Sequence, residues 1–336
     1  MAGCVTALAL AGCGGGGGGG ASMADPVPVG TTPTSPANPD PLPLPSPAPD
    51  TPPTPGAPLV TGNIALDGRA WLNFRRSQVG LSTLAHNTVI DIAAQGHSDY
   101  QRINNTITHD QIAGRQGFTG VDVNARLEAA NYRFNTSASR AFGEVISATA
   151  NGSGQYMAEE LITAVYHRFV IFEPVFKEIG TGAATTGAGY NYFTANFTAN
   201  NGYGAGLASG QVAVWPFSGQ TAVPIDFFSD TEKPDPIPPC SDNPAPGCGL
   251  NRVGYPISVH ANIDVTVQVT SFTVRPRGGA DLAVRLLSNA NDSHTGRSSA
   301  AIVPLAALAA NTVYEVSFAG TAGNTPVTRT WSFTTR

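Results

Sequence analysis

Charged residues are scarce in this sequence, at 12% of 336 positions, which is about half the usual share of a soluble globular domain. The formal net charge at pH 7 is −5, and no stripe of Lys and Arg runs along the chain. Because nucleic-acid binding requires a basic surface, we expect no nucleic-acid partner. No apolar run reaches the roughly 20 residues that cross a bilayer, so we predict no transmembrane helix. Hydrophobic residues still make up 41% of the chain, enough for buried cores.

The sequence also lacks the local motifs of two large hydrolase classes. It contains neither an HExxH metalloprotease motif nor a GxSxG nucleophile motif. No Ser, Cys or Thr stands in another recognisable nucleophile motif. These absences argue against an enzyme of either class.

Cysteine is rare, with four residues in the whole chain. Since no CxxC pair occurs, a zinc site built from cysteines is poorly supported. Cys240 and Cys248 lie close together in a Pro-rich segment and would be the only cysteines of the mature chain if Cys13 becomes its N-terminus. In an exported protein we expect them to form a local disulfide, with two free thiols as the alternative.

The N-terminus is apolar and then abruptly all glycine. Residues Leu10 to Cys13, "LAGC", match the bacterial lipobox, in which the cysteine is lipidated after signal cleavage. No Lys or Arg precedes the apolar run, although signal peptides normally have one, so we expect the true start to lie further upstream. We interpret residues 1–13 as a shortened lipoprotein signal peptide with Cys13 as the lipidated residue. A low-complexity start without a targeting role is the alternative.

Composition divides the rest of the chain into four parts. Residues 14–62 are rich in Gly, Pro, Ser and Thr, a composition that cannot offset chain entropy by burial, and we predict a disordered tether. Residues 63–235 form the first folded domain, and residues 236–250 a second linker that carries the cysteine pair. Residues 251–336 form a small second domain.

The hydrophobic periodicity of the first domain is helical and then strand-like. Helices are predicted over three regions, of which the first breaks at Gly80: 67–100, 121–130 and 156–166. Strands separated by Gly-rich turns follow in three regions: 176–184, 190–198 and 210–216. Only strand-like runs appear after residue 251. The pattern predicts an α+β fold followed by a small all-β sandwich.

Five stretches of the first domain resemble, in order, motifs of the CAP superfamily: cysteine-rich secretory proteins, antigen 5, plant pathogenesis-related proteins and bacterial SCP-like members. They cover most of residues 66–200 and read "LNFRRSQVGLSTLAHNTVIDIAAQGHSDY", "ITHDQ", "ARLEAANY", "FGEVIS" and "YHRFVIFEPVFKEIGTG". No single stretch is specific to this superfamily, but all five in the superfamily's order are. The resemblance implies a three-layer α-β-α sandwich for residues 63–235.

The resemblance also implies a cleft. In the family, the histidine of a His-Arg motif faces the histidine of a Ser-His turn and the glutamate of a Gly-Glu-Asn motif. The matching residues here are His167, His109 and Glu144. Two imidazoles and a carboxylate can hold a divalent cation or share protons near neutral pH. We therefore expect a cleft of these three residues, with His109 and His167 as ligands of a divalent metal, Zn²⁺ or Ca²⁺.

Two departures from the family pattern weaken the metal site. Many members carry a second glutamate where this chain has Ala164, and Glu160 lies about 10 Å further along a helix. Val145 replaces the asparagine that follows the motif glutamate. The set of four metal-binding side chains is therefore incomplete.

The charged residues around these motifs have simpler interpretations. We expect Arg168 to pair with a nearby carboxylate, Glu173 or Glu178. His97 is interpreted as a structural or capping residue, and His86 as a surface residue. His260 and His294 lie in the second domain and are not predicted to belong to a site.

The last 85 or so residues resemble bacterial Ig-like domains. The ending "PLAALAANTVYEVSFAGTAGNTPVTRTWSFTTR" is similar to their Leu-x-Pro, Thr-x-Tyr-x-Val, Gly-Thr and Trp-x-Phe-x-Thr pattern. Tyr314 and Trp331 are predicted core residues. We favour a spacer role for this domain, and adhesion or glycan contact is the alternative.

The sequence leaves three functions open. We favour an extracytoplasmic, non-enzymatic binding module, because the family resemblance implies a scaffold that binds lipid- or sterol-type ligands or an envelope partner. A metal-assisted hydrolase acting on peptide or envelope material, with Glu144 as base, is one alternative. A structural envelope protein is the other. In each case we expect the chain to be anchored to the membrane through Cys13, at the outer membrane or cell surface, or to be secreted.

Overall fold

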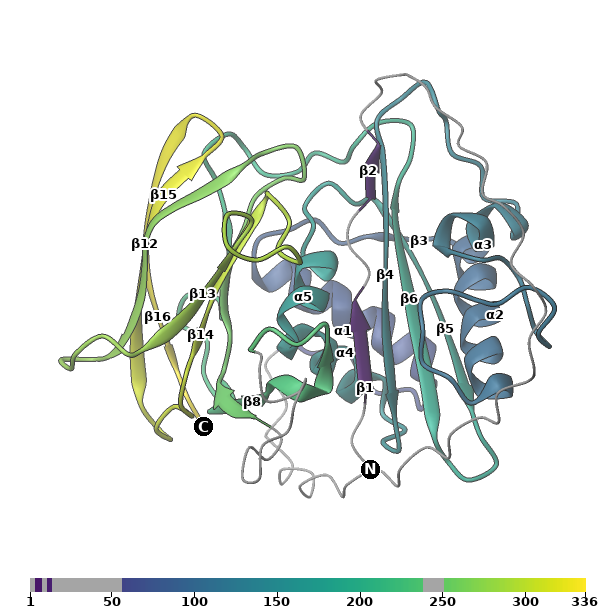
Figure 1. Ribbon diagram of the computed structural model, residues 1–336, viewed down its shortest axis with the longest axis horizontal. Helices are drawn as coiled ribbons and strands as arrows, with labels where there is room; N and C mark the ends of the chain where they lie inside the picture. Colours follow the sequence, from purple (N-terminus) through teal and green to yellow (C-terminus); the bar gives the residue numbers. More distant parts are fainter. Residues whose placement is uncertain (1–3, 8–10, 14–55, 238–250) are drawn as a thin grey trace, which may run out of the picture.

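The computed structural model describes residues 4–7, 11–13, 56–237 and 251–336. These residues form an α+β fold, in which a layered N-terminal domain is followed by a C-terminal all-β region (Figure 1). The predicted fold class is therefore confirmed. Cys240 and Cys248 lie outside the described residues, so their disulfide stays a prediction. Cys13 is the last residue of a short strand, β2, and its lipidation is likewise still a prediction.

A seven-stranded sheet forms the middle layer of the N-terminal domain, in the order β3-β5-β6-β4-β1-β9, with β2 also paired to β4. The three long strands are β4 (Arg140–Thr149), β5 (Glu178–Thr185) and β6 (Asn191–Ala199). The four short strands are β1 (Cys4–Ala7), β2 (Ala11–Cys13), β3 (Ala85–His86) and β9 (Glu232–Lys233). The long strands pair antiparallel and are buried almost throughout, as a sheet covered on both faces requires.

Helices cover both faces of this sheet (Figure 1). On one face lie α2 (Thr88–Asn104) and α3 (Val123–Ala129). On the other lie α1 (Ile64–Gln78), α4 (Gly154–Thr163) and α5 (Val165–Ile171). Four helices start at a side-chain cap that accepts a backbone N–H, and these caps are Asn63, Asn87, Asp122 and Ser153. Helix α5 has no such cap, because Ala164 precedes it.

Two glycines of β5 explain why α2 packs so closely on the sheet. A Cβ on Gly182 would lie 2.2 Å from the backbone nitrogen of Gln95, and one on Gly180 would lie 2.4 Å from that of Asp91. Any larger residue would push α2 away from the sheet. The "GTG" of the last motif is therefore a packing feature that fixes α2, and with it His97, against the sheet.

The C-terminal domain has two main sheets packed face to face. The four-stranded sheet has the order β13-β14-β11-β7: β13 (Val284–Ser288), β14 (Ser299–Pro304), β11 (Ile257–His260) and β7 (Ala213–Trp215). The three-stranded sheet has the order β12-β15-β16: β12 (Val267–Pro276), β15 (Val313–Ala322) and β16 (Thr325–Thr334). Tyr314 and Trp331 are 3% and 7% exposed, which confirms that both are core residues.

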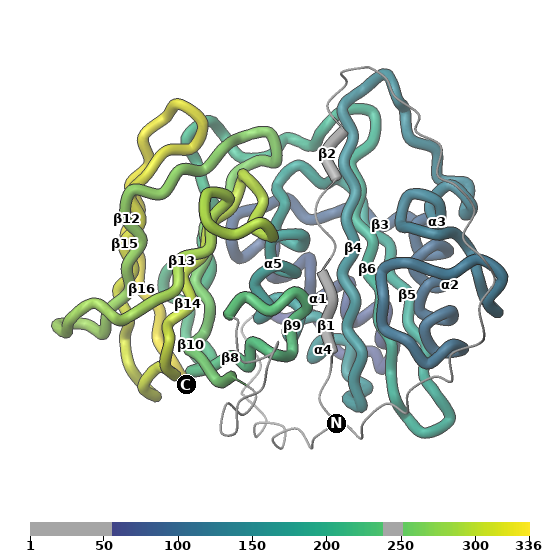
Figure 2. The backbone as a smooth tube through the Cα atoms, viewed as in Figure 1, coloured from purple at the N-terminus to yellow at the C-terminus, as the bar shows by residue number. Residues whose placement is uncertain are grey.

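The chain moves between the two domains more than once. Strand β7, which the sequence pattern assigned to the first domain, pairs with β11 of the C-terminal sheet. A 3₁₀ turn (Ser229–Thr231) and strand β9 then return to the N-terminal domain, whereas β8 (Asp226–Phe228) pairs with β10 (Arg252–Gly254). Figure 2 shows β8, β9 and β10 between the two parts of the molecule. The predicted domain boundary at residue 235 therefore lies after β7, although β7 belongs to the C-terminal sheet.

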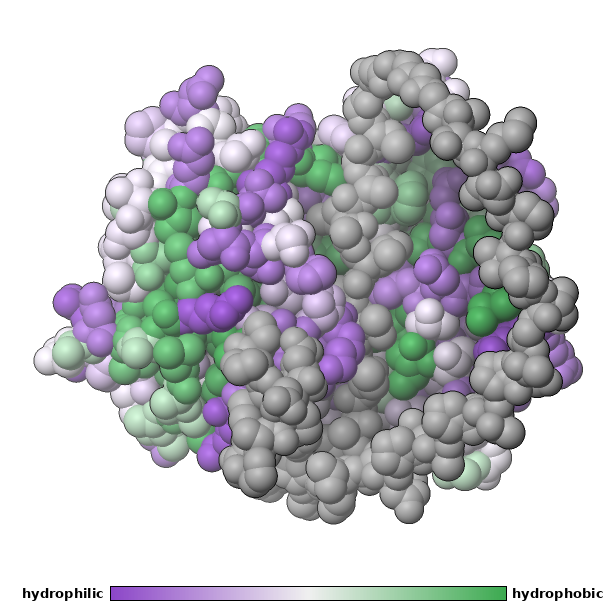
Figure 3. Space-filling model, viewed as in Figure 1, coloured by the Kyte–Doolittle hydropathy of each residue, from purple (hydrophilic) through white to green (hydrophobic). Residues whose placement is uncertain are grey.

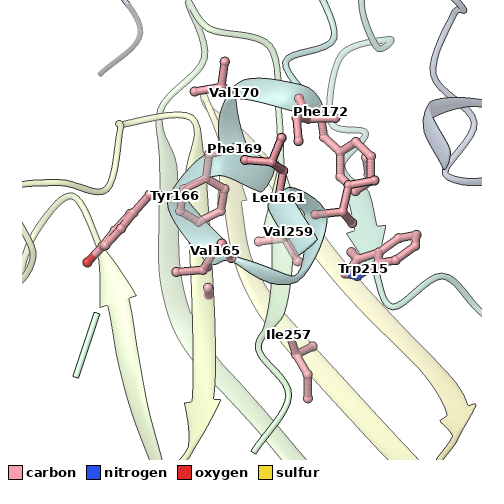
Figure 4. Close-up of a cluster of buried hydrophobic side chains, with 14 of the residues drawn as sticks. Leu161, Val165, Tyr166, Phe169, Val170, Phe172, Trp215, Ile257 and Val259 are labelled. Atoms are coloured by element: carbon pink, nitrogen blue, oxygen red, sulfur yellow. The ribbon is translucent and has the colours of Figure 1, made fainter. Parts of the chain in front are cut away.

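One continuous hydrophobic core joins the domains. Every residue of α5 is buried, and its side chains pack against β7 and β11 (Figure 4). Phe172 lies 5.3 Å from Trp215, measured between ring centroids. The same core cluster continues from the N-terminal helices into the C-terminal sandwich. Helix α5 is thus shared by both domains, although the sequence predicted only one helix, ending near Tyr166.

None of the helices in the described part of the chain has the length and hydrophobicity needed to span a bilayer.

Candidate functional site

Glu144 is the centre of a buried polar cluster on the α2/α3 face of the sheet. It lies in β4 and is fully buried. Arg126 of α3, equally buried, donates from Nη2 to both carboxylate oxygens, at 2.8 and 2.7 Å. His109 donates from Nδ1 to Oε1 at 2.8 Å. Charge-assisted bonds of this length fix the position of the carboxylate.

Arg126 also holds the loop that carries His109. Its Nη1 donates to the backbone oxygen of His109 at 2.7 Å. One guanidinium therefore positions both members of the His109–Glu144 pair. Arg126 belongs to the stretch "ARLEAANY", and its position between the buried apolar residues Val123 and Leu127 of α3 is the sequence signal for its role.

His97 completes the cluster from α2. Its Nε2 donates to the Thr108 oxygen at 2.7 Å, and its Nδ1 accepts from Gln111 at 2.9 Å. Burial, aided by Arg126 and His109 and opposed by Glu144, lowers the pKa of His97 to about 4. His97 is therefore neutral at pH 7 and braces the loop, which is a structural role.

The charge of Glu144 is stabilised by its neighbours. Burial alone would raise the pKa of this carboxyl, but Arg126, His97 and His109 together lower it to about 2. The group is thus ionised at neutral pH. Because its oxygens already accept three hydrogen bonds, it is a poor proton acceptor and is not available as a strong metal ligand.

One ring nitrogen of His109 takes no part in the hydrogen bonds of the cluster. With Nδ1 bonded to Glu144, its Nε2 is buried and has no hydrogen-bond partner among the described residues. The residue is 7% exposed. Buried polar atoms without a partner are rare in native structures. In the neutral imidazole this nitrogen carries a lone pair, so it can accept a hydrogen bond or bind a metal ion.

The structure places His167 in a second cluster, at the junction between the domains. His167 is fully buried in α5, and its Nδ1 lies 3.0 Å from Oε1 of Glu232. The same carboxylate accepts the backbone N–H groups of Val165 and Tyr166, at 2.8 and 2.6 Å. Glu232 therefore caps α5 from a distant part of the chain, in the place that Ala164 cannot fill. No sequence signal identified this residue.

The expected pairing of Arg168 with Glu173 or Glu178 is wrong. The guanidinium donates to three backbone oxygens and one hydroxyl, those of Ile162, Thr163, Pro256 and Ser258. Glu173 instead bonds His260 at 3.1 Å, and Glu178 bonds Asn87 and Tyr132. Arg168 reaches carbonyls of both domains because α5 lies between them, a position that local sequence does not show.

The three predicted cleft residues are thus divided. His109 and Glu144 are brought together, whereas His167 is paired with Glu232. Within the described ranges, no group of three or more His, Cys, Asp and Glu side chains is arranged to hold a metal ion. Glu160, which might have supplied a second carboxylate, accepts from Ser147 on the opposite face of β4 from Glu144. The residues present do not fit a four-ligand metal centre.

The remaining histidines agree with the simple interpretations. His86 is exposed and pairs with Asp91 at 2.5 Å. His260 is buried at the domain junction, against Glu173.

Comparison with known proteins finds a family match within the N-terminal domain. Residues 71–197 match the CAP family, described as the cysteine-rich secretory protein family. An extracellular protein with an SCP domain from Bacillus anthracis is similar, at 24% identity over 44% of each chain and a TM-score of 0.34. An outer surface protein from Borrelia burgdorferi shares 15% identity over 39% of this chain and 89% of its own, with a TM-score of 0.33.

The chain therefore spans less than half the length of the Bacillus anthracis protein. No curated protein matches the sequence. The matched range contains His97, His109, Arg126, Glu144 and His167. Over residues 71–197 this chain is therefore similar to the CAP family.

Proposed function

We propose that this protein is an extracytoplasmic, non-enzymatic binding module, tethered to the envelope through lipidated Cys13, whose CAP domain binds its ligand at Nε2 of His109. The observation that carries the proposal is the state of the His109–Glu144 pair. Glu144 is held by Arg126 and ionised, while Nε2 of His109 is buried and has no hydrogen-bond partner among the described residues.

The same geometry argues against hydrolysis. A general base needs a pKa near the working pH, and that of Glu144 is about 2. Among the described residues, neither His109 nor Glu144 has a side-chain hydrogen bond to a Ser, Thr or Cys that could act as a nucleophile. A hydrogen-bond donor on a ligand would satisfy Nε2 without any further chemistry.

An envelope component is favoured over a lipid or sterol. Two depressions, of about 540 and 300 Å³, lie over the β12-β15-β16 sheet and beside the start of α1, and neither is lined by His109. A sterol needs a largely apolar cavity that encloses it. A peptide or glycan of the envelope offers a single donor group, which would reach the buried Nε2 of His109 only if the side chains that cover it move.

Binding measurements test this proposal directly. We expect one of four probes to bind the purified chain with micromolar affinity: soluble peptidoglycan fragments, a fluorescent sterol, a fluorescent fatty acid, or Zn²⁺ alone. His109→Asn keeps a donor toward Glu144 but removes Nε2, and should weaken binding by at least about tenfold. His260→Asn is the matched control, because His260 belongs to a similar buried pair far from the cluster.

Three results would overturn the proposal. Equal binding by wild type and His109→Asn would exclude Nε2 as the contact. Cleavage of a peptidoglycan fragment that is lost in His109→Asn would make the protein a hydrolase. An unchanged precursor in cells treated with globomycin would exclude the lipid tether.

A further inference from the structure

Four large apolar side chains are exposed together on the α2/α3 side of the N-terminal domain. They are Ile103 at 37%, Ile112 at 57%, Phe118 at 37% and Val121 at 50%. Three of them lie in one loop, residues 111–121, and Ile103 lies beneath it on α2. Figure 3 shows apolar surface among polar residues on the side of the molecule that carries these helices. Clustered exposure of this kind marks an interaction site more often than scattered exposure does.

The loop has a defined structure, so the exposure does not come from a lack of order. Two consecutive turns bond Arg115 N to Ile112 O and Phe118 N to Arg115 O, each at 3.2 Å. The loop is closed by a 2.9 Å bond from Gln111 N to Val121 O. It is also tied to α2, because Ile112 N donates to the Tyr100 hydroxyl at 2.9 Å. The apolar side chains are therefore held outward by a backbone whose own groups are bonded.

Gly117 makes this shape possible. Its φ of +78° is in the left-handed region, and a Cβ there would lie 3.2 Å from Cδ1 of Ile103. The loop can thus lie directly on Ile103, which joins the helix residue to the three loop residues in one surface. We call Ile103, Ile112, Phe118 and Val121 the loop patch.

One cation lies within the loop patch. Arg115 is exposed between Ile112 and Phe118 and forms no ion pair among the described residues. Arg102, the residue before Ile103 on α2, is already paired with Asp99 at 3.3 Å. Asp110 and Asp122 flank the loop at its two ends, and Asp122 is used as the cap of α3. The centre of the patch is therefore positive and apolar at once.

We propose that the loop patch docks the N-terminal domain on an anionic bilayer. Apolar side chains around an unpaired arginine match the two components of such a surface, the acyl chains and the lipid phosphates. The loop patch would then set which face of the N-terminal domain lies on the membrane. This contact is separate from the His109 site and does not depend on it.

Vesicle sedimentation tests the proposal. The full chain is used with Cys13→Ser, so that acylation cannot bind it to vesicles. We expect it to bind vesicles that contain phosphatidylglycerol more tightly than vesicles of phosphatidylcholine alone. Phe118→Ser with Ile112→Ser should reduce binding to the anionic vesicles by about tenfold or more. Arg115→Glu should remove the preference for phosphatidylglycerol.

Leu305→Ser is the matched control, because Leu305 is 52% exposed on the C-terminal domain and should not affect vesicle binding. Circular dichroism and thermal unfolding establish that each variant is folded before it is compared. Equal binding by wild type and Phe118→Ser/Ile112→Ser would overturn the proposal, as would no binding of the wild type to either vesicle. A soluble protein that binds the wild type and not the double variant, without any vesicle binding, would assign the loop patch to a protein partner instead.

Discussion

Two of the buried histidine–carboxylate pairs among the described residues, His109–Glu144 and His167–Glu232, have similar distances but differ in what surrounds them. In His109–Glu144, an arginine neutralises the carboxylate and one imidazole nitrogen is left without a partner. In His167–Glu232, the carboxylate is used by the backbone N–H groups that begin α5. The first pair therefore has capacity for a ligand, whereas the second holds a helix end at the domain junction.

The arginines of the two clusters differ in the same way. Arg126 bonds a carboxylate and one carbonyl, so it sets the charge of its cluster. Arg168 bonds only neutral oxygens, from residues on both sides of the junction. A buried cation can serve either to tune a site or to join two domains, and the acceptors it finds decide which.

Removing the C-terminal domain should have the largest effect on the junction. A chain ending at residue 237 would expose α5 and leave β7 without β11. Because every residue of α5 is buried, we expect loss of cooperative unfolding, measured by circular dichroism during a urea titration. A shortened chain with the midpoint of the full protein would show that the domains are independent.

Arg168→Met should destabilise the protein by about 3–5 kcal/mol, because it leaves several buried oxygens without a donor. The measurement is the free energy of unfolding in urea. Arg252→Met is the matched control: Arg252 is a half-exposed partner of Asp226, and such pairs contribute about 0.2–1 kcal/mol. Similar losses in the two variants would contradict the role given to Arg168.

Low pH should lower the free energy of unfolding through Glu144, over a defined pH range. The pKa of Glu144 in the folded protein, about 2, lies below its ordinary value of 4.5. Ionised Glu144 therefore stabilises the fold above pH 4.5, and about 3 kcal/mol of this is lost as the pH falls from 4.5 toward 2. Urea unfolding at several pH values measures the loss, and Glu144→Gln should be less stable at pH 7 and should lack this dependence.

Protonation of His97 defines a second pH range in which the folded protein loses stability. Its pKa falls from 6.5 to about 4 on folding, so the unfolded chain binds its proton first as the pH falls. Stability is then lost between pH 6.5 and 4, and His97→Gln should remove only this part. A wild-type stability that is constant from pH 7 to pH 4 would contradict the burial argument for His97.

His109→Asn should have the smallest effect on stability, within about 1 kcal/mol at pH 7, because the amide keeps a donor toward Glu144 and Nε2 has no bond to lose. The same variant should lose ligand binding. Thermal unfolding and binding, measured on one preparation, check both halves of this statement. A large loss of stability would show that His109, like His167, has a structural role.

The family resemblance implied that His109, Glu144 and His167 line one cleft. The structure pairs His109 with Glu144 and His167 with Glu232. The partner of His167 is Glu232, 65 residues further along the chain in a segment without a distinctive pattern. Such a contact depends on the return of the chain to the N-terminal sheet at β9, which hydrophobic periodicity does not describe.

Strand β7 shows the same limit for the fold. An apolar run such as "AVW" predicts a strand, but it fits either of two sheets equally well. Pairing with β11 decides the sheet, and β11 lies beyond the linker that appeared to separate the domains. Element types were therefore readable from the sequence, whereas the domain boundary required tertiary contacts.

The repeated passage of the chain between the domains has a consequence for proteolysis. Residues before 238 supply β7 and β8 to partners β11 and β10, which come after residue 250. A cut between these positions would give two fragments that each complete the other's sheets. The nicked protein should therefore migrate as a single species under native conditions, and its two fragments, produced as separate chains, should reassemble by complementation.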